Sequence, residues 1–99
     1  MTFVAKTSEV PNFGKKVVTV ANREILLVNF KETIYACENE CPHQSAQMTA
    51  SIVKDGTISC PRHGYRFSLV DGSCADHPDW VLKIFPVTLQ GDDILINMD

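Results

Sequence analysis

The chain has 99 residues, which is enough for one domain and too few for a second, catalytic one. Hydrophobic residues make up 44% and charged residues 21%, a composition typical of globular proteins that argues against an intrinsically disordered chain. The formal net charge of -3 argues against a nucleic-acid partner, because phosphate recognition normally requires a clustered basic surface.

The beginning of the chain has no basic region followed by a long apolar stretch, and no apolar run approaches membrane-spanning length. We therefore expect a soluble, cytoplasmic protein with no membrane partner. In a reducing compartment, the four cysteines should be thiols or metal ligands rather than disulfides.

The first strong pattern along the chain predicts a hairpin. Residues 16–20 and 24–28 are rich in Val, Ile and Leu, and residues 21–23 separate them. A further strand is expected at residues 33–36, running toward the cysteines.

Two Asp-Gly pairs then predict tight turns, because glycine readily takes a positive φ. Residues 55–56 separate short apolar runs at 52–53 and 57–58. Residues 71–72 follow a similar run at 66–69.

The end of the chain predicts two more strands, at residues 81–89 and 94–98, joined across residues 90–93. No segment shows a sustained helical period. Short strands with frequent turns predict an all-β fold, an antiparallel sandwich or partly open barrel, in a single domain over residues 1–99.

Two segments between the expected strands carry cysteine and histidine together. Cys41-Pro42-His43 is followed, after 16 residues, by Cys60-Pro61-Arg62-His63. Each loop thus offers one thiolate and one imidazole. Thiolates suit the iron of a sulfide cluster, and two imidazoles can replace two thiolates on its second iron.

With these motifs the sequence resembles the Rieske ferredoxins, whose loops read C-x-H and C-x2-H-G. The resemblance continues through residues 60–67 and 71–72, and in residues 85–87 and 91–94 near the end. It implies a Rieske-like β fold in which a small cluster-binding subdomain, about residues 37–80, lies on a larger base.

The resemblance also implies the ligands of one 2Fe-2S cluster. Cys41 and Cys60 would bind one iron, and His43 and His63 would bind the other. The implied role is that of an electron carrier without catalysis of its own. A flavin-dependent ferredoxin reductase would donate single electrons, and a terminal ring-hydroxylating oxygenase would accept them from a monomer. Docking is expected at the exposed histidine tip, with Arg62 in contact with the partner.

Two alternatives remain open at this point. A related electron carrier, the small subunit of an NAD(P)H-dependent nitrite reductase, has the same fold and similar loops. Two cysteines and two histidines could also hold a structural zinc ion, although zinc sites more often use C-x2-C or H-x3-H pairs.

Some positions depart from the family pattern or fall outside it. Gln44 and Ser51 stand where the family often has glycine, so a positive φ there would cost energy. Cys37 and Cys74 are expected to be buried apolar residues rather than ligands or a disulfide pair. His77 is expected to be solvated, and Trp80 to lie in the core or to shield the cluster.

Overall fold

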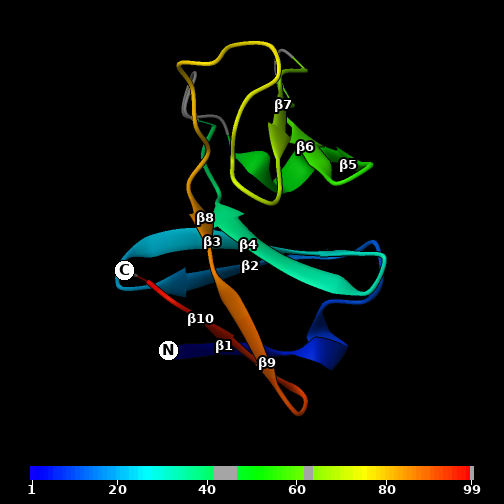
Figure 1. Ribbon diagram of the computed structural model, residues 1–99. Coiled ribbons are helices and arrows are strands. Elements are labelled where there is room, and N and C mark those ends of the chain that lie inside the picture. Colours follow the sequence, from blue (N-terminus) through cyan, green and yellow to red (C-terminus); the bar gives the residue numbers. More distant parts are fainter. Residues whose placement is uncertain (42–46, 62–63, 99) are drawn as a thin grey trace.

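The computed structural model describes residues 1–41, 47–61 and 64–98. The elements in these ranges are short strands and two single-turn 3₁₀ helices (Figure 1). In chain order they are β1 (Thr2–Lys6), η1 (Thr7–Glu9), β2 (Lys15–Val20), β3 (Arg23–Phe30), β4 (Thr33–Glu38), η2 (Met48–Ala50), β5 (Ile52–Lys54), β6 (Thr57–Ser59), β7 (Arg66–Ser68), β8 (Ile84–Phe85), β9 (Val87–Gln90) and β10 (Asp93–Ile96).

The strands form three antiparallel sheets, with the orders β1-β10-β9, β2-β3-β4-β8 and β5-β6-β7. Figure 1 shows β5, β6 and β7 grouped at the end of the molecule away from both termini. The predicted all-β class is therefore confirmed. The boundaries of the cluster-binding part remain a prediction. No helix in the described residues has the length and hydropathy needed to cross a membrane.

The first hairpin forms as predicted, with β2 paired to β3 from Lys15 opposite Val28 to Val20 opposite Arg23. Its turn needs a positive φ at two successive residues, Ala21 at 51° and Asn22 at 66°. This is the turn geometry whose twist matches that of the paired strands. The turn between β3 and β4 is of the same kind but is built from Lys31 and Glu32, which carry no glycine signal.

The two Asp-Gly pairs behave differently. Asp55 and Gly56, with φ of 53° and 76°, close the predicted hairpin between β5 and β6. Gly72 also has a positive φ, 81°, and lies in the turn that brings the chain back from β7 to an isolated antiparallel bridge between Phe67 and Cys74. Its backbone packs against another segment, because the Leu82 N–H donates to the Gly72 carbonyl at 2.8 Å.

The single strand predicted at residues 81–89 is wrong. The structure divides this stretch into β8, which pairs with β4, and β9, which pairs with β10 in a different sheet. Pro86 lies between them. Proline has no N–H to donate and a fixed φ, so the ladder is interrupted and the chain changes sheets there. Strand β1 lies outside the predicted set.

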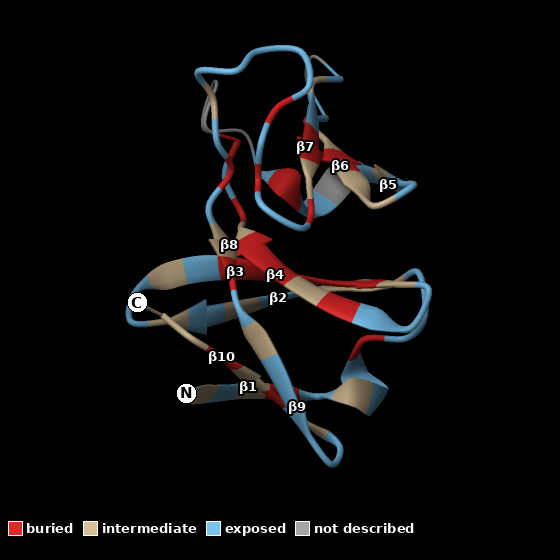
Figure 2. Cartoon of the chain, in the orientation of Figure 1, coloured by how far each residue is buried: buried red, intermediate tan, exposed pale blue. Residues whose placement is uncertain are grey.

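Two buried clusters form the core, and β3 contributes to both (Figure 2). Leu26 and Val28 face the cluster beneath the β5-β6-β7 sheet, whereas Ile25 and Leu27 face the cluster beneath β1 and β10. Successive side chains of a strand point to opposite faces, which explains this alternation. A central strand shared by two cores is therefore apolar on both faces.

Candidate metal centre

The two cysteines of the motifs lie just beyond strand ends and are brought into one buried cluster. Cys41 follows β4 and is 0% exposed, and Cys60 follows β6 directly and is 1% exposed. Both belong to the cluster beneath β5-β6-β7. None of the four cysteines is disulfide-bonded. The fold thus gathers two buried thiols that the sequence separates by two strands and a 3₁₀ turn.

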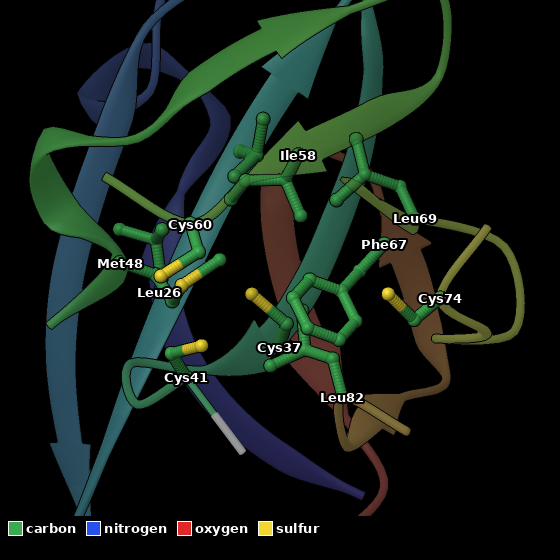
Figure 3. Packing of buried hydrophobic residues seen from close by; sticks show 11 residues of the cluster. Leu26, Cys37, Cys41, Met48, Ile58, Cys60, Phe67, Leu69, Cys74 and Leu82 are labelled. Atoms are coloured by element: carbon green, nitrogen blue, oxygen red, sulfur yellow. The ribbon is translucent and has the colours of Figure 1, made fainter. Parts of the chain in front are cut away.

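Figure 3 shows the surroundings of these thiols. Cys41, Cys60, Cys37 and Met48 lie on one side of the cluster in that view, and Cys74 lies beyond the ring of Phe67. Apolar side chains surround the sulfur atoms, so an ion or cluster bound there would be kept from bulk water on the cysteine side.

The second loop is closed by its own backbone. The Cys60 N–H donates to the Tyr65 carbonyl at 2.8 Å, and the Gly64 N–H donates to the Cys60 carbonyl at 2.8 Å. Gly64 has a φ of 71°, which favours glycine. Among the described residues nothing lies within 4 Å of where its Cβ would be, so the backbone conformation accounts for the glycine without crowding by protein.

The first loop is anchored on both sides by Asn39, which is 4% exposed. Its amide nitrogen donates to the Glu24 carboxylate at 3.0 Å, and its amide oxygen accepts from the Thr49 hydroxyl at 3.0 Å. Asn39 precedes Cys41, and Thr49 follows the loop in η2. Sequence reasoning missed this residue, although a polar residue beside a ligand motif was a signal that could have drawn attention to it.

The concern about Ser51 is resolved by its conformation. Its φ is -70°, so the position does not require glycine. Its backbone N–H donates to the Met48 carbonyl at 3.0 Å, and its hydroxyl donates to the same oxygen. Ser51 thus closes the η2 turn. Gln44, the other departure, lies outside the described residues.

The predicted histidine ligands, His43 and His63, also lie outside the described residues, as does Arg62, the expected docking residue. Within the described residues, no group of three potential metal-ligating side chains comes together. The four-residue ligand set is therefore a prediction, of which the structure supplies the two cysteine positions.

Cys37 and Cys74 are buried in the same cluster, as predicted for apolar residues. Burial, with a smaller contribution from the charge of Glu38, raises the pKa of the Cys37 thiol to about 12. Without a bound metal that thiol is therefore protonated at neutral pH and a poor nucleophile.

His77 is exposed, as expected, and its ring also stacks on Trp80 with centroids 4.0 Å apart. Trp80 is only half-buried and packs against the apolar core cluster beneath β5-β6-β7 rather than within it. Both rings contact Tyr65, the last residue of the Cys60 loop.

The donor set suits a 2Fe-2S cluster. Two buried thiols from separate loops are the ligands that one iron of such a cluster requires, and each is followed by a histidine at the motif spacing. A zinc ion could use the same four atoms, so the donor atoms alone do not separate the two metals.

Comparisons with known proteins favour the 2Fe-2S cluster over the zinc ion. The model of the Rieske [2Fe-2S] domain family matches residues 1–86. The ferredoxin component of the naphthalene 1,2-dioxygenase system of Pseudomonas aeruginosa is 31% identical over 91 residues, which is 91% of this chain and 88% of that protein.

Solved structures share the fold. The ferredoxin of carbazole 1,9a-dioxygenase from Nocardioides aromaticivorans IC177 superposes with a TM-score of 0.86 at 24% identity, covering 97% of each chain. A structure assigned to a nitrite reductase NADPH small subunit gives a TM-score of 0.89 at 20% identity, covering 97% of this chain and 96% of that one. With a family model that matches most of its length, this chain belongs to the Rieske [2Fe-2S] domain family.

Proposed function

We propose that this chain passes single electrons from a flavin-dependent reductase to a terminal ring-hydroxylating oxygenase. Its only redox group would be a Rieske 2Fe-2S cluster bound by Cys41, His43, Cys60 and His63. The observation that carries the proposal is the pair of buried cysteines in one core cluster, each at the start of a C-x-H or C-x2-H motif.

The chain's own residues hold and insulate the site. Cys41 and Cys60 would supply two thiolates to one iron from the buried side, and the two histidines would supply imidazoles to the other. A bound cluster of this type takes up and releases one electron at a time. The apolar side chains of Met48 and Phe67 keep water from the thiolates on the protein side.

The relatives favour an oxygenase system as the partner. The Pseudomonas aeruginosa relative matched over 91% of this chain is a ferredoxin component of a dioxygenase system. The likeness to the nitrite reductase subunit, at 20% identity, supports the shared fold only. The reductase, the monomeric state and the cytoplasmic location expected from the sequence belong to this proposal.

Metal analysis of protein purified without added metal tests the cofactor. We expect iron and acid-labile sulfide at about two of each per chain, because there is one predicted set of four ligands. Zinc at one per chain without sulfide would mean a structural zinc domain instead.

A reconstituted electron-transfer assay tests the partner class. The reduced protein should be reoxidised by a terminal dioxygenase with turnover of its aromatic substrate, and it should not support nitrite reduction by a nitrite reductase large subunit. The reverse pattern would reject the oxygenase assignment while leaving the electron-carrier role intact.

A further inference from the structure

Three aromatic rings from two distant segments meet beside the Cys60 loop. The His77 and Trp80 rings are stacked, with centroids 4.0 Å apart and planes 25° apart. The Tyr65 ring lies 5.1 Å from each, at interplanar angles of 86° and 68°. Stacked and edge-to-face pairs at these distances are favourable arrangements of rings. We call this group, Tyr65, His77 and Trp80, the aromatic clamp.

The segment that carries His77 and Trp80 is tied to the backbone next to Tyr65. The Ala75 N–H donates to the Arg66 carbonyl at 3.1 Å, and the Arg66 N–H donates to the Asp76 carboxylate at 3.0 Å. The Arg66 guanidinium lies 3.5 Å from the same carboxylate. The backbone N–H of Trp80 donates to the His77 carbonyl at 3.1 Å and closes the turn between these two residues. The clamp is thus held by backbone contacts as well as by its rings.

Tyr65, one of the three clamp residues, also closes the Cys60 loop. The Tyr65 carbonyl accepts the hydrogen bond from the Cys60 N–H at 2.8 Å, so displacement of Tyr65 would shift the backbone of Cys60. His77 is exposed and belongs to neither core cluster, so core formation does not explain its stacking.

We propose that His77 and Trp80 are positioning residues that hold Tyr65 and, through it, keep the Cys60 loop in one geometry around the bound cluster. The inference rests on the proposed function, because it concerns the cluster that Cys60 would bind. Groups that orient metal ligands without touching the metal commonly tune its affinity and potential.

The proposal predicts the direction of two effects. Without the His77 ring, Trp80 and Tyr65 each lose one ring contact, so the hydrogen bonds of the Cys60 loop should open more often. Water should then reach the Cys60 sulfur more easily. Hydrogen-bond donors to a cluster sulfur stabilise the more negative, reduced form, so the reduction potential should rise.

The test compares three variants of the cluster-loaded protein. His77→Ala removes the ring, and His77→Phe keeps a ring without a titratable group. Phe13→Ala is the matched control, because exposed Phe13 makes an edge-to-face contact with Phe30, centroids 5.7 Å apart, outside the clamp. Hydrogen exchange of peptides covering residues 60–65 and protein-film voltammetry supply the two measurements.

We expect the amide hydrogens of the Cys60 loop to exchange about tenfold faster in His77→Ala than in the wild type, consistent with the loss of two ring contacts. The reduction potential of this variant should be higher. His77→Phe should restore both values, and Phe13→Ala should change neither. A His77→Ala protein that loads no cluster while His77→Phe does would support the same conclusion.

The proposal would be overturned if the His77→Ala protein exchanged the amide hydrogens of the Cys60 loop at the wild-type rate and had the wild-type reduction potential. It would also fail if His77→Phe behaved like His77→Ala, or if Phe13→Ala changed the same two values. Absence of iron and sulfide from the wild-type protein would instead reject the proposed function, and loop exchange would still test the clamp on the protein as purified.

Discussion

Replacing Gly72 by alanine should destabilise the protein strongly, and Gly56→Ala is its matched control. Both glycines have similar positive φ values, 81° and 76°. They differ in their surroundings. A Cβ on Gly72 would lie 1.9 Å from the Leu82 carbonyl oxygen, whereas a Cβ on Gly56 would meet nothing within 4 Å.

The expected loss in the free energy of unfolding has two contributions, one from the backbone conformation and one from the contact with Leu82. Left-handed backbone costs a non-glycine residue about 1–2 kcal/mol, and this cost applies to both variants. The clash at Gly72 must in addition displace the backbone of Leu82 and break its 2.8 Å hydrogen bond to Gly72, a further loss of about 1–3 kcal/mol. Gly72→Ala should therefore lose roughly 2–5 kcal/mol in total.

Thermal unfolding, followed by circular dichroism on cluster-loaded proteins at equal concentration, measures the difference. Each 1 kcal/mol corresponds to about 4–8 °C in a domain of this size, so Gly56→Ala should lower the midpoint by roughly 4–16 °C. Gly72→Ala should lower it by at least about 4 °C more. Equal midpoints for the two variants would refute the contact between the 72 turn and Leu82.

Three further predictions concern the site and its surroundings. Replacing Cys41 or Cys60 by serine should abolish the cluster's visible absorption, because a hydroxyl is a poor ligand for sulfide-bridged iron; full retention of iron and sulfide would remove that cysteine from the ligand set. The wild-type potential should lie toward the bottom of the Rieske range of roughly -150 to +300 mV with little pH dependence near neutrality, since Phe67 offers no hydroxyl to the cluster. Phe67→Tyr should raise it in voltammetry, whereas Phe85→Tyr, in the other core cluster, should not; a wild-type potential well above zero would contradict the argument. The backbone N–H of Arg66, and then its charge, hold the pKa of Asp76 below its ordinary value of 3.8, so this carboxylate stabilises the fold above that pH and the contribution is lost as the pH falls through the lowered pKa. The thermal midpoints of wild type and Asp76→Asn should therefore differ at pH 6 and converge as the pH falls below 3.8, and a difference that stays constant with pH would exclude the ionised Asp76 as its source.

How far the sequence predicts this fold depends on how local each feature is. The hairpins at residues 21–22 and 55–56 could be predicted because apolar runs and turn residues lie within a few positions of each other. The cysteine-histidine motifs are local too; their residue types indicate a metal centre, and their resemblance to the Rieske loops indicates the family. That two buried cysteines lie in one cluster, however, depends on β4 and β6, which belong to different sheets.

Only the tertiary structure decided the features that join distant segments. Pro86 was a local signal for a break that the single predicted strand did not use, and nothing local indicated that β8 and β9 would join different sheets. Part of the need for glycine at residue 72 comes from Leu82, ten residues away. Likewise His77 was expected in a solvated loop and is exposed there, but only the fold shows that its ring contacts Trp80 and Tyr65. Sequence patterns predict the conformation of residues that are close together in the chain. Contacts between separate loops form only when the sheets pack, so these patterns do not predict them.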